Sequence, residues 1–173
     1  MALLPILTAP DKRLKQKALP VADVNQKIRQ LMDDMLETMY AAPGIGLAAP
    51  QVGVLQQVIV VDVGSEQAEQ QQAAPLLLAN PEIIRAEGEL PWKEGCLSVP
   101  DHVAEVLRSA SIQVRALDRN NQRIEIQAAG LLAVCLQHEI DHLHGTLFID
   151  HLSRLKRALI LQKLKKQKEK EKE

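Results

Sequence analysis

The sequence predicts an α+β fold, with antiparallel β-sheets packed around a central helix that carries an HExxH motif. The expected elements run helix, strands, helix, helix, so the strands are grouped rather than alternating with helices. The strands are short and follow one another through turns, which favours antiparallel pairing. An apolar run over 130–143 is longer than a typical strand and predicts a buried helix. An N-terminal amphipathic helix and a C-terminal helix complete the prediction.

The chain length predicts a single domain. With 173 residues, the chain fits one domain, with its body over 1–153 and a basic C-terminal helix or tail of the same domain over 154–173. From Arg154 onward, nine Lys or Arg and three Glu give a net charge of +6, so residues 1–153 carry −7 for a total of −1. An acidic body with a basic tail is typical of an interaction tail.

The composition excludes several classes of protein. Aromatic residues make up only 2% of the chain, which argues against a nucleic-acid platform that stacks bases, so no sequence-specific nucleic-acid partner is expected. No segment approaches the ~20 apolar residues of a membrane span, and no signal peptide is recognised, so no membrane partner is expected. The two cysteines do not make a disulfide framework, and we therefore expect a reducing, cytoplasmic location.

The first helix is expected to begin at Asp23 or Asn25, either of which can cap it, and to reach about Tyr40. Pro43 and Gly44 end it. Its apolar residues recur at steps of three and four, which predicts one buried face. The residues of this face are Ile28, Leu31, Met32, Met35, Leu36 and Met39.

The middle of the chain predicts short strands. Residues 44–53 are small and show no regular period, whereas 57–63 are typical of a buried strand. A Gln- and Ala-rich segment over 64–75 is expected to be a surface loop, and Asn80-Pro81 to be a turn or a break in a strand pair. The remaining predictions are loop into strand over 92–100, strands over 103–108, 111–117 and 123–127, and a hairpin turn over 119–122.

Two helices are expected after the strands. The first spans 130–143, and Gly145 lies where a C-terminal cap is expected. The second begins at Arg154 and is amphipathic. Its apolar stripe, which can pack on the body, is Leu155, Leu159, Ile160 and Leu164.

The central helix contains His138-Glu139-Ile140-Asp141-His142. Residues four apart on a helix share a face, so the two imidazoles can converge on one metal ion, and Glu139 can take a proton from a water that the metal activates. The alternative is a pair of polar residues on a solvated helix face. The helix is apolar on most sides before His138, and buried His and Glu require partners, which favours the metal site.

A catalytic site of this kind needs a third protein ligand and one open position. The metzincin pattern supplies its third ligand as a His after a Gly. Gly145 fits that pattern, but Phe148 stands where the ligand His is required, so the pattern fails.

The position of each remaining His or Cys in the sequence indicates whether it could be the third metal ligand. His144 lies on the wrong side of the helix, and Cys135 is two turns from His142 and fits a small apolar wall. His102 and His151 have no motif around them. Cys96 follows a flexible glycine, and its thiolate would complete a Cys-His-His site.

Three segments resemble the signature segments of the peptide deformylase family. They are GIGLAAPQVG at 44–53, EGCLSVP at 94–100 and QHEIDHLHG at 137–145, in the family's order and with similar spacing. The HExxH motif alone does not distinguish a deformylase from a protease, but the three together are specific. The similarity extends over nearly the whole chain, from the first helix to the basic C-terminal helix.

This resemblance implies a hydrolase that removes the N-formyl group from the N-terminal formylmethionine of newly synthesised polypeptides and releases formate. It implies that Cys96, His138 and His142 hold one divalent metal ion. Iron(II) is expected in the cell, and zinc, nickel or cobalt are expected to replace it. Glu139 would act as the general acid/base for a metal-activated water.

The resemblance also implies roles around the metal. The Gln51 amide and the backbone N–H of Leu97 would stabilise the oxyanion. Backbone groups of Ile45, Gly46 and Gly95 would pair with the peptide, since glycines allow a close approach. Without the other motifs these glycines would indicate only tight turns. The methionine pocket would be lined by Gly44, Ile45, Leu131, Val134, Cys135 and His138.

One position departs from the family pattern. Some relatives carry Arg where this chain has Val103, so a role of that Arg in holding the downstream peptide is not carried over, whereas Arg108 matches a later basic position. The rival enzyme is an HExxH metallo-endopeptidase, which should show a protease-type third ligand. The rival from another class is a structural zinc site, which prefers four protein ligands.

The basic tail has two interpretations. A solvated helix end that keeps the protein soluble is the simpler one. The resemblance implies instead that the C-terminal helix docks on the ribosome near the exit tunnel, where nascent formylated peptides emerge and phosphates attract Lys and Arg.

Overall fold

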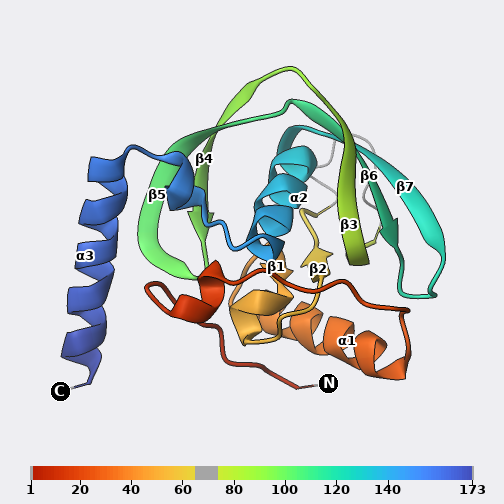
Figure 1. Ribbon diagram of the computed structural model, residues 1–173, viewed down its shortest axis with the longest axis horizontal. Helices are drawn as coiled ribbons and strands as arrows, with labels where there is room; N and C mark the ends of the chain where they lie inside the picture. Colours follow the sequence, from red (N-terminus) through yellow and green to blue (C-terminus); the bar gives the residue numbers. More distant parts are fainter. Residues whose placement is uncertain (1, 65–73, 173) are drawn as a thin grey trace.

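The computed structural model describes residues 2–64 and 74–172 and has a mixed α+β architecture (Figure 1). Helix α2 lies in the middle, with a five-stranded sheet on one side and a two-stranded sheet on another. The main elements in chain order are α1 (Gln26–Ala41), β1 (Gly46–Ala48), β2 (Val58–Val61), β3 (Leu76–Glu87), β4 (Leu90–Cys96), β5 (Val99–Arg108), β6 (Ser111–Leu117), β7 (Arg123–Ala129), α2 (Gly130–Leu143) and α3 (Arg154–Glu171). Short 3-10 turns η1 (Lys12–Lys15), η2 (Ala49–Val52) and η3 (Phe148–His151) join them.

Helix α1 begins where the sequence supplies a cap. The Asn25 side chain accepts a hydrogen bond from the Ile28 N–H at 3.0 Å, which satisfies one of the free amides of the first turn. Of the two caps that the sequence allowed, Asn25 is therefore the one used. The buried face includes Met32, Met35 and Met39, and it packs against one face of the larger sheet. The predicted amphipathic helix is confirmed.

The larger sheet has the order β1-β2-β3-β6-β7, and all its pairs are antiparallel. All four residues of β2 are buried because both faces of the sheet are covered. Val58 and Val60 belong to the core that includes α1, whereas Ile59 and Val61 belong to the core that includes α2. Successive side chains of a strand alternate between faces, so α1 and α2 lie on opposite faces of this sheet.

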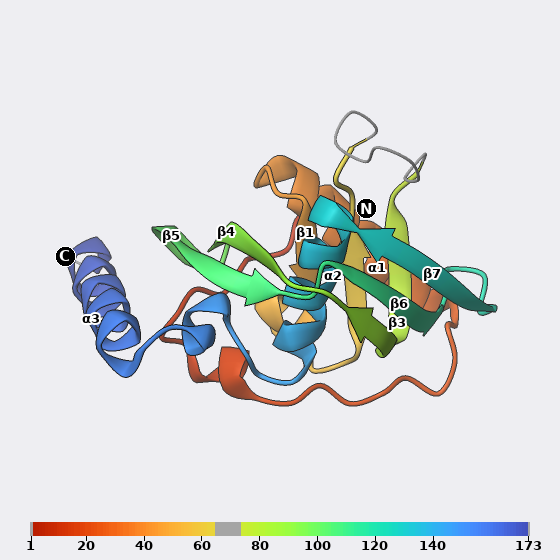
Figure 2. The same cartoon turned by 90° about the horizontal axis from the view of Figure 1, so that it is seen from above.

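Strands β4 and β5 form a separate antiparallel hairpin (Figure 2). Cys96 pairs with Val99, so Leu97 and Ser98 make the two-residue turn between the strands. This turn brings the end of β4 to the α2 side of the molecule. The hairpin therefore supplies a second wall to the space beside α2.

One segment differs from the sequence prediction, and a second decides between two alternatives that the sequence left open. Gly46–Ala48, expected to be irregular, forms β1, because its backbone pairs with β2. Asn80-Pro81 is not a turn, but it does interrupt the pairing of β3 with β6, so the alternative of a break in a strand pair is confirmed. β3 runs through it with a shift in register, and the Asn80 side chain bonds both the N–H and the C=O of Val21 at 2.8 Å. The Asn-Pro pair is thus accommodated as an irregularity within the strand rather than as a turn. Most of the loop expected over 64–75 lies outside the described residues.

Helix α3 stands beside β5 (Figure 1), and the stripe predicted for it is partly wrong. Leu164 is buried, and Ile160 and Leu161 pack on the same core, but Leu155 and Leu159 are 70% and 48% exposed. The packed face is therefore rotated toward the C-terminal half of the helix. No helix in the described part of the chain is long and apolar enough to cross a membrane.

Candidate metal centre

Three side chains that can bind a metal converge between the hairpin and α2. Cys96 ends β4, and His138 and His142 lie one turn apart on α2. Their ligand atoms all lie within 4.8 Å of one another. The two Nε2 atoms are 3.2 Å apart, and Cys96 Sγ is 3.5 Å from His142 Nε2. The structure thus brings together the three ligands that the sequence predicted.

These separations fit a tetrahedral cation. Bonds of roughly 2.0–2.1 Å to nitrogen and 2.3 Å to sulfur place tetrahedral ligand atoms roughly 3.3–3.6 Å apart. The Cys96 Sγ–His142 Nε2 distance of 3.5 Å lies in that range, and the Nε2–Nε2 distance of 3.2 Å is just below it. A thiolate with two imidazoles is a donor set that divalent transition metals accept. Three protein ligands leave one tetrahedral position for water or substrate. The residues therefore fit a catalytic metal better than a closed structural one.

Glu94 fixes the orientation of His138. Its Oε1 lies 2.8 Å from His138 Nδ1, and the natural assignment is that Nδ1–H donates to the carboxylate. The Nε2 lone pair then faces Cys96 and His142. A carboxylate behind a ligating histidine is the usual way to hold the ring and raise its basicity. The predicted ligand is thus supported from a strand of the other sheet.

Glu94 is itself held by Arg108. The guanidinium donates to the carboxylate through Nε at 2.6 Å and Nη2 at 2.8 Å, and through Nη1 to Asp141 at 2.7 Å. Burial alone would raise the pKa of Glu94, but the bonds from Arg108 and His138 lower it below its ordinary value. The Glu94 carboxylate therefore stays charged. Asp141 also accepts from His151 at 2.9 Å, which extends the network to the surface.

The pKa values of the two imidazoles are shifted in opposite directions. Burial lowers the pKa of His142 well below its ordinary value, which suits a neutral ligand. Burial opposes a charge on His138, but nearby anionic groups, Glu139 first among them, outweigh it and raise its pKa well above the ordinary value. The centre therefore favours one positive charge at this place, which a proton or a metal cation can supply.

Glu139 lies beside the three candidate ligands and is not part of their cluster. Burial raises the pKa of its carboxyl to about 7. Its Oε1 is buried and has no hydrogen-bond partner among the described residues. A buried carboxylate without a partner is costly to a fold, and a pKa near neutrality suits a group that gains and loses a proton.

A glycine makes the room for this carboxylate. A Cβ at Gly46 would overlap Glu139 Oε2 and would lie 2.9 Å from Cys135 Sγ. The Cys135 thiol lies 3.6 Å from the Ile45 carbonyl oxygen, so β1 runs close along this part of α2. Any side chain at position 46 would displace Glu139 or the strand.

Gln51 approaches the same centre from η2. Its Oε1 accepts from the Ala48 N–H at 2.9 Å, so its amide nitrogen faces the other way. Nε2 lies 3.0 Å from Ser98 Oγ and 3.6 Å from Cys96 Sγ. The N–H of Leu97, in the adjoining turn, donates none of the hydrogen bonds found within 2–64 and 74–172. Two donors are thus present next to the candidate metal position.

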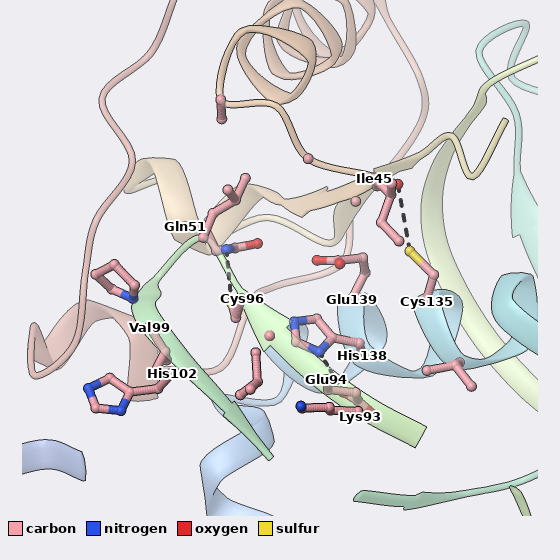
Figure 3. Close-up of a pocket in the computed structure, with 18 of the residues that line it drawn as sticks. Ile45, Gln51, Lys93, Glu94, Cys96, Val99, His102, Cys135, His138 and Glu139 are labelled. Carbon is pink, nitrogen blue, oxygen red and sulfur yellow. Dashed lines mark hydrogen bonds and ion pairs between the residues drawn. The ribbon is translucent and has the colours of Figure 1, made fainter. Parts of the chain in front are cut away.

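A pocket of about 690 Å³ opens onto this centre, and Figure 3 shows Glu139, His138 and Cys96 on its wall. Except for His142, which lies beneath it and is 1% exposed, every site residue predicted from the sequence lines this pocket. These residues are Gly44, Ile45, Gly46, Gln51, Gly95, Cys96, Leu97, Leu131, Val134, Cys135, His138 and Glu139.

Sequence reasoning missed several neighbours of this pocket. Glu94 was assigned no role, although alternation along β4 puts it on the same face as Cys96, and that signal could have found it. His102 lines the pocket, and Figure 3 shows it near Val99 on β5, although no motif surrounds it. Val103 also lines the pocket and is 58% exposed, so its apolar side chain stands at the rim.

Comparisons with known proteins identify the family. The family model described as "Polypeptide deformylase" matches residues 3–158, most of the chain. The chain belongs to the polypeptide deformylase family. It is therefore a hydrolase of a metalloenzyme family, and the group formed by Cys96, His138 and His142 has side chains that could hold a metal ion.

Similar deformylases are found in several bacteria. The chain is 58% identical over 167 residues to a peptide deformylase of Methylocella silvestris, covering 96% of this chain and 85% of that one. It is 56% identical over 166 residues to a peptide deformylase of Alkalilimnicola ehrlichii, covering 96% and 91%. The crystal structure of a peptide deformylase from Ehrlichia chaffeensis superposes with a TM-score of 0.92 at 42% identity, covering 98% and 99% of the two chains. The same fold therefore extends over almost the full length of both proteins.

Proposed function

We propose that this chain removes the N-formyl group from the N-terminal formylmethionine of newly synthesised polypeptides and releases formate. The observation that carries the proposal is the buried Glu139 carboxylate, whose Oε1 has no hydrogen-bond partner among the described residues. It lies beside a convergent Cys-His-His cluster at an open pocket in a member of the deformylase family. Residues 1–153 would form the catalytic domain around a central metal-binding HExxH helix, with 154–173 as its basic tail. Both cysteines are free, which supports a reducing, cytoplasmic location.

The metal would be held by Cys96, His138 and His142, with Glu94 orienting His138. A divalent cation bound there would polarise the formyl carbonyl and lower the pKa of a water molecule. We assign iron(II) as the ion used in the cell on the family resemblance alone. Zinc, nickel or cobalt could replace it, because a mixed thiolate and imidazole donor set accepts all of them.

The proton is moved by Glu139. Its carboxylate takes a proton from the attacking water and delivers it to the departing amine as the C–N bond of the formamide breaks, so the same group serves as base and then as acid. The water oxygen stays on the formyl carbon and leaves in formate. The raised pKa of Glu139, about 7, suits both transfers near neutral pH.

Hydrogen-bond donors and the residues that line the pocket would position the substrate. The Gln51 amide and the Leu97 N–H would stabilise the negative charge that develops on the formyl oxygen. Backbone groups of Ile45, Gly46 and Gly95 would pair with the peptide. The methionine side chain would enter the part of the pocket lined by Gly44, Ile45, Leu131, Val134, Cys135 and His138.

Formate release tests the function directly. Freshly purified full-length protein, protected from oxygen, should release formate from formyl-Met-Ala-Ser and yield intact Met-Ala-Ser. Unformylated Met-Ala-Ser is the blank for background formate. Mass spectrometry separates this activity from the metallo-endopeptidase alternative, because a peptidase would cut between Met, Ala and Ser. Internal cleavage without formate would overturn the proposal.

The C-terminal helix would dock on the ribosome. Lys165, Lys166, Lys170 and Lys172 are all exposed, so their charges are available to phosphates. Deletion of 165–173 retains Leu164, whose side chain is buried in the body, and removes the hydrogen bond from Lys168 to the Thr8 carbonyl. The pocket lies elsewhere and draws no residue from this segment.

Deletion of 165–173 should therefore leave formyl-peptide turnover nearly unchanged and weaken co-sedimentation with ribosomes at low salt. Replacing the four exposed lysines by Gln should weaken binding in the same way, whereas replacing them by Arg, which keeps the charge, should not. Binding should also fall steeply as salt is raised. Equal ribosome binding by the full-length, truncated and Gln-substituted proteins would reduce the tail to a solvated helix end.

A further inference from the structure

Ser98 connects the metal centre to its candidate oxyanion donor. It occupies the turn between β4 and β5, and its side chain is fully buried. Its N–H donates to Cys96 Sγ at 3.4 Å, its Oγ accepts from Gln51 Nε2 at 3.0 Å, and its carbonyl accepts from the Ala9 N–H at 2.8 Å. The main chain of Ser98 thus supports the metal ligand, while its side chain supports the amide.

The orientation of the Gln51 amide is set at both ends. The Ala48 N–H holds Oε1, which turns the NH₂ group toward the hairpin. One hydrogen of this NH₂ group can be donated to Ser98 Oγ. The other hydrogen then points toward Cys96 Sγ, which lies 3.6 Å from Nε2. Figure 3 shows the Gln51 amide approaching Cys96 in this way. Without the hydroxyl, the nitrogen end of the amide would lose the one oxygen partner that it has within residues 2–64 and 74–172.

We propose that Ser98 is a positioning residue for the reaction: its hydroxyl holds one amide hydrogen of Gln51 so that the other faces the reacting formyl oxygen. This inference rests on the proposed function, in which Gln51 is an oxyanion donor. A donor contributes to catalysis only when it is already aimed at the place where charge develops. The hydroxyl of Ser98 therefore acts through Gln51, whereas the Cys96 sulfur is supported by the Ser98 backbone and should be indifferent to the side chain.

The direct test is the state of the Gln51 amide in zinc-loaded, full-length protein. In ¹H–¹⁵N spectra, the side-chain NH₂ pair of Gln51 is assigned by its absence from Gln51→Ala. In the Ser98→Ala protein, this pair should shift and exchange with solvent at least tenfold faster, whereas Ser98→Thr, which retains a hydroxyl, should preserve its protection. Zinc content should stay near one per chain in both. An unchanged Gln51 amide in Ser98→Ala would overturn the proposal.

Kinetics supply the second readout. Ser98→Ala should lower kcat by about tenfold or more with KM nearly unchanged, less than the ~10²–10³-fold loss expected when an oxyanion donor is removed outright. In the Gln51→Ala background, Ser98→Ala should have almost no further effect, because the two residues act as a unit. A further loss of the same size in that background would overturn the proposal, since it would show that Ser98 acts independently of Gln51.

The two readouts separate this inference from the proposed function. If the wild-type protein releases no formate, the function is wrong, but the amide spectra still decide whether Ser98 orients Gln51. If formate is released and the amide of Gln51 does not respond to Ser98→Ala, the function stands and the inference fails. Loss of zinc in Ser98→Ala would also overturn it, because the side chain would then act on the metal ligands.

Discussion

Glu139→Gln should lower kcat for formate release by at least ~10²–10⁴-fold, the usual contribution of general acid–base catalysis. The amide has the size of the carboxylate but cannot accept the proton. The native carboxyl is buried, has a pKa raised to about 7 by that burial, and presents an oxygen with no partner in the described structure. Because Glu139 is not one of the three converging ligands, metal content should stay near one per chain.

A matched control exists on α1. Glu37 Oε2 is also buried without a partner among the described residues, but it lies outside the residues that line the pocket. Glu37→Gln should therefore keep nearly full turnover, and kcat and metal content of both variants can be measured side by side. A Glu139→Gln protein with near-wild-type kcat would remove Glu139 from the mechanism. Loss of metal from it would indicate that the carboxylate is a ligand.

Cys96→Ala should lose tight metal binding and activity together. The thiolate is one of the three proposed ligands, so its removal would leave a pair of imidazoles from a single helix turn. Altering only the groups behind a ligand typically costs 10–100-fold in metal affinity, and loss of the ligand itself should cost more. Metal content after dialysis and the rate of formate release report the two losses independently.

The other cysteine is the control for this experiment. Cys135 is buried on α2, and its thiol faces the Ile45 carbonyl rather than the three ligands. Burial raises the pKa of this thiol well above its ordinary value, so it remains protonated and is a poor ligand. Cys135→Ala should retain one metal per chain. If Cys96→Ala keeps both metal and activity, Cys96 is not a ligand.

Much of this architecture could be predicted because it is encoded locally. Helix α2 has the predicted bounds, Gly130 to Leu143, since a long apolar run begins and ends at conformationally permissive glycines. Strand β6 also has the predicted bounds, Ser111–Leu117. Both depend on periodicity and on end signals that lie within a few residues of the element itself.

The features that could not be predicted depend on partners far away in the sequence. Strand β1 exists because β2 pairs with it, and β3 continues through Asn80-Pro81 because the Asn80 amide bonds Val21. The buried contacts of Glu94 with Arg108 and His138 join residues 14 and 44 positions apart. No local pattern specifies such pairs, although alternation on β4 indicates which face Glu94 occupies.

In the candidate site, too, some residues could be predicted from a local pattern and others depend on contacts that are distant in the sequence. The motif around His138 specified two candidate ligands, because residues four apart lie on the same face of a helix. Cys96, by contrast, could be selected only by elimination and resemblance, since its approach to His142 depends on where the hairpin packs. The roles of Ser98 and Glu94 became visible only when their hydrogen-bond partners were located in space.

The origin of the three ligands has a consequence for folding. Cys96 comes from the β4–β5 hairpin, while both imidazoles come from α2, and Cys96 and His142 are 46 residues apart. An unfolded chain does not hold these atoms together, so a cation that binds them selects the native state. Free metal ion in excess of its dissociation constant adds about 1.4 kcal/mol to the free energy of unfolding for each further tenfold excess. A cation held by these ligands would therefore act as a reversible cross-link between hairpin and helix, and the midpoint of thermal denaturation should rise with its free concentration.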